Sequence, residues 1–322
     1  MIPGPPLETP VLLIAYRRAS TTRTVIQSLR AVQPRKLYFS VNGPNPANAG
    51  EEAQCQSVRE LADEIDWDCQ VEKLFRKEHL SARDSIAGGI TWFFANVEEG
   101  IVLEDDCICD PSFFFFAREL LERYRDDPRI MQIGATNFAP RAFSGPASYG
   151  FSNFAYIWGW ASWRRAWSKC DLEMSSFGND DVERILKSRF TRAEDISHWR
   201  VLYRYLRSGN LNTWDGQWNF SVFRHQGLSV FPHVNLVHNI GFGELSTNTT
   251  TLTTAVGDMQ LGSLDWPLVH PDVIEVDRAS DEAVSDTVFG VRKSYRTLHL
   301  KMRVASLLSP QLRGKVKKML GW

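Results

Sequence analysis

The chain has 322 residues, of which 43% are hydrophobic and 23% are charged, and its formal net charge is −1. This length is too great for one minimal domain and fits a single large α/β domain with an extension. The composition is typical of a globular protein, and the lack of an apolar run near 18 residues argues against a membrane span.

Basic residues are concentrated in the segment 287–322. It contains nine of the 37 lysines and arginines and no acid, which leaves 28 basic residues against all 38 acidic ones in the rest of the chain. An acidic body of this kind argues against nucleic-acid binding. A basic amphipathic tail fits peripheral binding to an anionic membrane and, equally well, an ordinary solvated helix. We therefore expect a main domain over 1–286 and a basic, helical C-terminal extension over 287–322.

The five cysteines are odd in number and lack the paired spacing of a metal site. They predict reduced thiols. The expected location is the cytoplasm, with the basic tail allowing contact with the inner face of the membrane.

Short apolar runs alternate with helical patterns through the first half of the chain. Strands are predicted at 11–15, 37–41, 70–75, 101–103 and 130–133. Helices are predicted at 21–31, at 51–65, from Ser81 until Gly100, and at 111–126. This repeating βα unit predicts a doubly wound, mostly parallel sheet flanked by helices, with ligands at the carboxyl ends of the strands. No glycine-rich phosphate loop follows the first strand, so a metal or basic side chains must neutralise phosphate.

Three consecutive carboxylates, Glu104, Asp105 and Asp106, end the fourth predicted strand. Acids crowded where a buried strand becomes a loop raise each other's pKa values, so the arrangement is unfavourable unless a cation is present. The stretch therefore predicts a divalent-metal site. Tyr16 and Asn42 follow the first and second strands and are expected at the same edge of the sheet.

Tryptophans are dense in the segment after Tyr149. Trp160, Trp163 and Trp167 have the spacing of one helical face and predict an amphipathic helix that docks on the sheet. Trp158 and Trp160 bracket Gly159 and predict a ligand-facing loop before that helix.

The rest of the chain is predicted from its polarity and its glycines. A charged, mostly helical outer layer is expected over 179–208, then an apolar helix introduced by Trp214–Trp218 and a strand over 228–231. The Gly- and Thr-rich stretch 238–254 has the composition of a loop that closes over a ligand.

An ordered set of these features makes the chain resemble GT-A-type glycosyltransferases, specifically the relatives of β-1,2-N-acetylglucosaminyltransferase I and related bacterial sugar transferases. The set comprises an Arg-containing turn after the first strand, an acidic triplet followed by Pro and Phe-Phe, a Gly-Trp pair, a Trp-Asp-x-x-Trp element and a Phe-Gly loop. These lie at Ala15–Arg17, Val102–Phe114, Gly159–Trp160, Trp214–Trp218 and Ile240–Gly243.

The resemblance implies a GT-A fold with a donor-binding half over about 11–135 and an acceptor and lid half over about 136–286. It implies metal-dependent transfer, with inversion, of a hexosyl or N-acetylhexosaminyl group from a nucleotide-diphospho-sugar to a hydroxyl of a glycan or lipid-linked acceptor. Asp106 would bind Mn²⁺ or Mg²⁺, while Glu104 and Asp105 orient the donor. The other donor-binding residues would be Tyr16, Arg17, Asn42, Arg83 and Asp84.

The resemblance also places the catalytic base in the Trp-Asp element, at Asp215. The chain departs from the family pattern here, because Gly216 stands where the family has a second acid, and Asp215 also suits the N-cap of the following helix. His238 is a candidate further metal ligand, although an ordinary loop histidine is the commoner case. The acceptor and lid residues would be Trp158, Trp160, His238, Asn239, Gly241 and Phe242.

Two other functions remain open from the sequence. A sugar-1-phosphate nucleotidyltransferase shares the sheet architecture, but it normally has a glycine-rich basic loop that Tyr16–Arg23 lacks. A non-enzymatic, tryptophan-rich carbohydrate-binding protein with a structural metal site is the second alternative.

Overall fold

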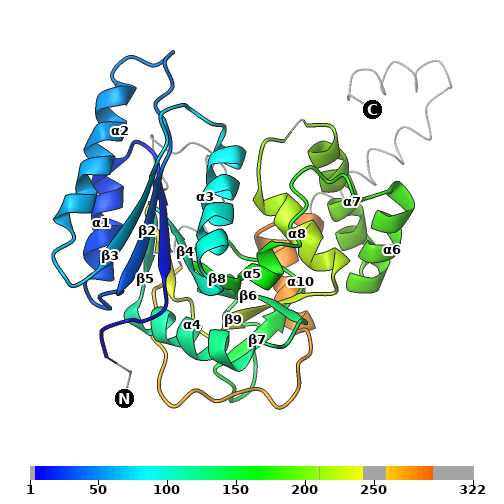
Figure 1. Ribbon diagram of the computed structural model, residues 1–322. Coiled ribbons are helices and arrows are strands. Elements are labelled where there is room, and N and C mark those ends of the chain that lie inside the picture. The colour runs from blue at the N-terminus through cyan, green and yellow to red at the C-terminus, as the bar shows by residue number, and fades with distance from the viewer. Residues whose placement is uncertain (1–3, 210, 242–258, 293–322) are drawn as a thin grey trace, which may run out of the picture.

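The centre of the protein is an eight-stranded mixed sheet (Figure 1). The computed structural model describes residues 4–209, 211–241 and 259–292. The strand order in the sheet is β3-β2-β1-β4-β8-β6-β9-β7, and β10 pairs separately with β5. The strands are β1 (Val11–Ala15), β2 (Lys36–Val41), β3 (Gln70–Phe75), β4 (Glu99–Glu104), β5 (Cys107–Cys109), β6 (Ile130–Gly134), β7 (Tyr149–Ser152), β8 (Trp160–Trp163), β9 (Leu228–Pro232) and β10 (Val237–Asn239).

Helices connect most of these strands. They are α1 (Ala19–Leu29), α2 (Glu51–Glu60), the 3₁₀ turn η1 (Leu61–Glu64), α3 (Ala82–Asn96), α4 (Pro111–Arg123), α5 (Arg164–Trp167), α6 (Asn179–Arg189), α7 (Ala193–Arg207), α8 (Asp215–Arg224) and α10 (Arg278–Thr287). Two predicted helix starts are confirmed by their caps. The side chain of Ser81 accepts a hydrogen bond from the backbone N–H of Asp84, and that of Asp110 accepts one from Ser112, with Pro111 at the first position of α4.

The four N-terminal strands of the sheet are parallel, as the βα pattern predicts. β1 pairs with β2 and β4, and β2 pairs with β3, all in parallel. β6 and β9 are also parallel, whereas β8 is antiparallel to both of its neighbours and β7 is antiparallel to β9. The predicted α/β class with a mostly parallel sheet flanked by helices is confirmed.

Both faces of the sheet are buried, because helices cover each of them. Side chains alternate along each strand, so successive residues pack into different core clusters. In β1, Leu13 belongs to a core cluster with residues of α1 and α4, while Leu12 and Ile14 belong to a second cluster with residues of α3, α5 and α8. A buried strand of this kind reads as a continuous apolar run. This is why the sequence predicted β1, β2 and β4 within two residues of their observed ends.

The helices α6, α7, α8 and α10 share a third core cluster, in which Phe154, Trp199 and Phe223 are buried. This group of helices lies on the far side of the molecule from α1 and α2 (Figure 1). One sheet runs through both halves that the sequence distinguished. Strand β8 lies between β4, on the side of β1 to β3, and β6, on the side of β9 and β7.

The helix predicted across Trp160, Trp163 and Trp167 is wrong. Trp160 and Trp163 lie on β8, and a single helical turn, α5, ends at Trp167. Trp160 packs in one core cluster and Trp163 in the other, on opposite faces of the sheet. Positions three apart lie on one face of a helix but on opposite faces of a strand, and here the strand has both faces buried.

The predicted basic extension lies mostly outside the described residues. Within the part of the chain that the structure describes, no helix has the length and apolar character needed to cross a membrane. All five cysteines are unpaired.

Candidate functional site

The acidic triplet lies at the carboxyl edge of the parallel strands. β1 and β4 are neighbours in register, with Ile14 opposite Glu104, so the chain leaves both strands at the same edge of the sheet. Glu104 is the last residue of β4, and Asp105 and Asp106 form the turn to β5. Asp105 is buried, and the other two acids are partly buried.

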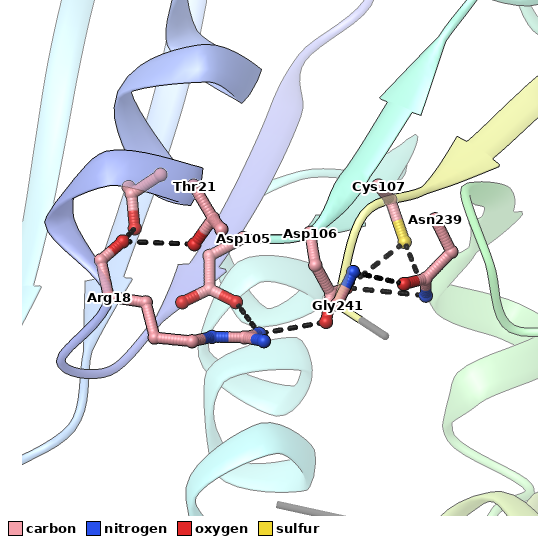
Figure 2. Close-up of polar contacts among 8 residues, drawn as sticks. Arg18, Thr21, Asp105, Asp106, Cys107, Asn239 and Gly241 are labelled. Atoms are coloured by element: carbon pink, nitrogen blue, oxygen red, sulfur yellow. Dashed lines mark hydrogen bonds and ion pairs between the residues drawn. The ribbon is translucent and has the colours of Figure 1, made fainter. Parts of the chain in front are cut away.

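Arg18 provides the positive charge that this triplet needs. Its Nη2 donates to the carboxylate of Asp105 and, over 2.7 Å, to Oδ2 of Asp106 (Figure 2). The backbone of Arg18 is fixed as the N-cap residue of α1, because its carbonyl accepts from the N–H of Thr22 at 3.0 Å and from the hydroxyls of Thr21 and Thr22 at 3.0 and 2.8 Å. A guanidinium between two carboxylates is a strong, charge-assisted arrangement.

The sequence singled out the preceding residue, Arg17, for the donor and missed Arg18. The signal was present, since three adjacent acids need a cation and two arginines follow the strand next to them. Which of two consecutive side chains points toward β4 depends on the backbone conformation of the turn, and that conformation was not predicted.

Burial dominates the ionisation of Glu104 and Asp105. It raises the pKa of Asp105 to about 6, an effect that Arg18 opposes and Asp106 reinforces. The pKa of Glu104 is raised well above its usual value by burial and then by the charges of Asp106, Asp105 and Asp215. Asp215 therefore lies close enough to act on the buried end of β4, although 109 residues separate Asp215 from Asp106 in the sequence.

Asp215 is the first residue of α8, and the preceding Trp214 occupies the N-cap position without a side-chain capping bond. The hydroxyl of Thr213 donates to the carboxylate of Asp215. A Cβ at the next position, Gly216, would lie 2.9 Å from a methyl group of Leu206 on α7. The packing of α7 against α8 thus leaves little room for a second acid at position 216. Asp215 is the carboxylate that the Trp214–Trp218 element retains.

The segment after β9 closes the other side of Asp106 (Figure 2). β10 pairs with β5, and the N–H of Ile240 donates to the carbonyl of Asp106 at 2.8 Å. Nδ2 of Asn239 lies 3.5 Å from Oδ1 of Asp106, and Oδ1 of Asn239 accepts from the N–H of Gly241 at 2.7 Å. A Cβ added to Gly241 would collide with the Asp106 carboxylate. The predicted lid residues Asn239 and Gly241 are therefore brought to the acidic triplet.

Two other predicted residues of this segment are placed differently. His238 is exposed on β10, opposite Ile108, and the alternation along the strand directs it away from the face that carries Asn239. Its role as a metal ligand stays a prediction without a supporting contact among the described residues. Phe242 lies outside the described residues.

Tyr16 and Arg17 meet at a buried glutamate that the sequence did not single out. The Tyr16 hydroxyl donates to Glu51, and Nη1 of Arg17 lies 3.0 Å from Oε2 of Glu51, which is 1% exposed. His79 also joins this group, with its Nδ1 3.1 Å from the Tyr16 oxygen. An open cleft of about 620 Å³ adjoins the group and is lined by residues 44–46, 48, 50, 52 and 77–79.

The remaining predicted donor residues make local contacts. Asn42 bonds the backbone at Leu80, donating at 2.9 Å and accepting at 3.2 Å, which ties the end of β2 to the loop before α3. Asp84 accepts from the Ser81 hydroxyl at 2.8 Å within the helix cap, and Arg83 pairs with Glu173. The described contacts of Arg83 and Asp84 do not reach the acidic triplet.

The prediction that Trp160 faces a ligand is wrong. Trp160 is 1% exposed and stacks on Trp214, with ring centroids 5.9 Å apart, because β8 carries it into the core between α3 and α8. Trp158 is only partly buried and packs edge-on against Phe138. The tryptophan cluster thus supports the start of α8, where Asp215 lies.

The donor atoms at the triplet suit a hard divalent cation. In the described part of the chain, no group of three or more His, Cys, Asp or Glu side chains is arranged to hold a metal ion. Asp105 and Asp106 nevertheless offer carboxylate oxygens, and Mg²⁺ is commonly held by one or two carboxylates together with substrate phosphates. The guanidinium of Arg18 already occupies the position between the two carboxylates as a stand-in cation. These residues therefore fit a cation that arrives with a diphosphate.

Comparisons with known proteins give weak structural matches. No protein-family profile and no curated protein matches the chain. A mannosyltransferase from Pyrobaculum calidifontis, solved with GDP-Man and Mn²⁺, is 8% identical with a TM-score of 0.38, over 70% of this chain and 72% of that one. A UDP-glucose pyrophosphorylase is 10% identical with a TM-score of 0.36, over 70% and 90%. Mouse xyloside xylosyltransferase 1 is 12% identical with a TM-score of 0.35, over 67% and 81%. TM-scores this low do not discriminate between these activities.

Proposed function

We propose that this protein is a metal-dependent glycosyltransferase that moves a sugar from a nucleotide-diphospho-sugar to a hydroxyl of a glycan or lipid-linked acceptor. The observation that supports it is that the charges of Asp106, in the turn after β4, and of Asp215, at the start of α8, both act on Glu104 at the end of β4. Glycosyl transfer needs both a centre that stabilises a diphosphate and a base for the acceptor hydroxyl.

The acidic turn and Arg18 would serve the diphosphate. A divalent cation held by Asp106, with Asp105 beside it, would neutralise the negative charge that accumulates on the leaving group. The cleft beside Tyr16, Glu51 and His79 lies at the same edge of the sheet and has room for the nucleoside.

Asp215 would act at the acceptor. Its carboxylate takes the proton of the attacking hydroxyl, and the hydrogen bond from Thr213 fixes its orientation. A base that deprotonates the attacking hydroxyl directly gives inversion at the anomeric carbon. Trp214 and Trp218, on either side of Asp215 in the sequence, are buried in the same core cluster as Val102 of β4.

A product assay tests this function against nucleotidyl transfer. The protein is incubated with Mn²⁺ and a panel of nucleotide sugars, with and without pyrophosphate. Glycosyl transfer, or slow hydrolysis of the donor, releases the nucleoside diphosphate, whereas a nucleotidyltransferase running with pyrophosphate releases the nucleoside triphosphate. We expect nucleoside diphosphate, and we expect EDTA to stop its release. Formation of the triphosphate would instead assign the protein to the second class.

A further inference from the structure

Arg18 occupies the carboxylates that the proposed function assigns to a metal. Its guanidinium bonds both Asp105 and Asp106, and its side chain is only 19% exposed. The two acids are 7% and 16% exposed, so leaving them unpaired is unfavourable. Arg18 is therefore the counter-ion of the acidic turn when no other cation is bound.

A divalent cation and the guanidinium compete for the same pair of carboxylates. Oδ2 of Asp106 lies 2.7 Å from Nη2 of Arg18, and on its other side Gly241 approaches so closely that a Cβ there would collide with the carboxylate. Two positive charges at one carboxylate repel each other. A metal bound at Asp106 therefore weakens the contact between this carboxylate and Arg18.

The backbone of Arg18 allows that movement without loss of its anchor. The three hydrogen bonds to its carbonyl hold the start of α1, whereas the guanidinium is held only through the two carboxylates among the described contacts. A released guanidinium at a helix N-terminus is well suited to bind a phosphate, through its own charge and the adjacent helix dipole.

We propose that Arg18 is an internal counter-ion that makes metal binding depend on the nucleotide. This inference rests on the proposed function. In the resting protein the guanidinium of Arg18 is bonded to both Asp105 and Asp106, and a free metal ion displaces this guanidinium poorly. A metal bound to a diphosphate displaces it readily, because the released guanidinium then contacts the phosphate. Arg18 thereby prevents the empty site from filling with metal before the donor arrives.

The test measures Mn²⁺ affinity without any nucleotide, by calorimetric titration of MnCl₂ into the wild-type chain and Arg18→Ala. We expect Arg18→Ala to bind Mn²⁺ about tenfold more tightly or better. This factor corresponds to a wild type in which Arg18 occupies the two carboxylates in roughly nine molecules of ten, so that only about a tenth of the protein is free to bind the metal. Inorganic pyrophosphate is the second probe, and the gain in Mn²⁺ affinity that it gives should be smaller in Arg18→Ala than in the wild type. The matched control is Arg23→Ala, which removes an exposed guanidinium of the same helix that pairs with Glu64.

A thermal measurement keeps the test valid if Arg18→Ala folds poorly. In EDTA the variant should unfold at a lower temperature than the wild type, because two acids lose their partner. MnCl₂ should then raise its unfolding temperature by more than it raises that of the wild type or of Arg23→Ala. Equal or weaker Mn²⁺ binding in Arg18→Ala, or Mn²⁺ binding by neither protein, overturns the proposal. If the wild type nonetheless shows metal-dependent release of nucleoside diphosphate, the proposed function survives and only the counter-ion role fails.

Discussion

Asp215 lies close enough to Glu104 for its charge to affect the ionisation of that carboxyl group. Its charge contributes to the raised pKa of Glu104, and the hydroxyl of Thr213 donates to it. A carboxylate that is oriented by a hydroxyl and lies near another acid is well placed to accept a proton from an acceptor. The proposed role depends on that protonation and not on the shape of the side chain.

Replacing Asp215 by Asn tests this role at the scale of one residue. The amide keeps the shape but accepts no proton, so we expect kcat to fall by about 10²–10⁴-fold with little change in the KM of the donor. Steady-state kinetics with a glycosyl acceptor measures both constants. Asp181→Asn, which alters a partly exposed acid in the first turn of α6, is the control and should behave as the wild type. Retention of most of the activity in Asp215→Asn would place the base elsewhere.

At this scale the sequence predicted the acids better than their partners. Asp106 and Asp215 were predicted from a strand end and a motif, and in the structure the charges of both act on Glu104. Glu51 was missed because a buried glutamate in a helical first turn looks like an ordinary N-terminal acid. Its partners Tyr16 and Arg17 come from the turn after β1, and Asn45 and Asn48 from the loop before α2. Contacts of this kind depend on loop conformation and not on local pattern.

β8 is the strand that joins β4, which leads into the acidic turn, to β6. It runs antiparallel between β4 and β6 and begins directly after Gly159, whose φ is +63°. A Cβ at this glycine would lie 2.7 Å from Sγ of Cys109 on β5. The left-handed glycine and the close approach together let β8 start where the acidic turn ends.

Gly159→Ala is expected to destabilise the protein through both causes. The left-handed backbone costs about 1–2 kcal/mol, and overpacking against Cys109 adds about 1–3 kcal/mol. Gly209→Ala is the matched control, because Gly209 has a φ of +71° and no atom within 4 Å of its added Cβ. Urea denaturation of both variants separates the two costs. Equal losses would mean that the contact with Cys109 relaxes freely.

The sequence predicted the parallel strands but not β7 and β8. An isolated apolar run with buried residues on both sides indicates a strand only when no helical spacing competes with it. The tryptophans at 160, 163 and 167 gave such a competing helical pattern. The antiparallel direction of these strands could not be predicted either, because the direction of a strand is set by its connections across the sheet and not by its residues.

The C-terminal part of the described chain returns to the sheet and contacts the end of β7. The N–H of Asp277 donates to the carbonyl of Phe151 on β7 at 2.8 Å. Asp281 on α10 accepts from the Ser152 hydroxyl at 2.5 Å and from the backbone and side-chain N–H groups of Asn153 at 3.0 and 2.9 Å. This buried carboxyl group fixes α10 to the end of β7.

The attachment of α10 is expected to depend on pH. Burial raises the pKa of Asp281 to about 7, against the opposing effect of its donors, from about 3.9 in the unfolded chain. The folded state therefore holds the proton more tightly, so the group's contribution to stability is complete below pH ~4 and is lost as the pH rises through ~7. Urea denaturation across this range should show that the stability advantage of the wild type over Asp281→Asn shrinks as the pH rises. A constant difference would mean that Asp281 is ionised throughout.

The central claim is that the acidic turn binds a nucleotide-diphospho-sugar through a metal, and a thermal-shift panel tests it most directly. The wild type and Asp106→Asn are heated with Mn²⁺ and each nucleotide sugar or its free diphosphate. We predict that one nucleotide sugar raises the unfolding temperature of the wild type well beyond its free diphosphate, and that this gain disappears in Asp106→Asn and in EDTA. Stabilisation by no nucleotide sugar, or equal stabilisation of Asp106→Asn, would contradict the claim.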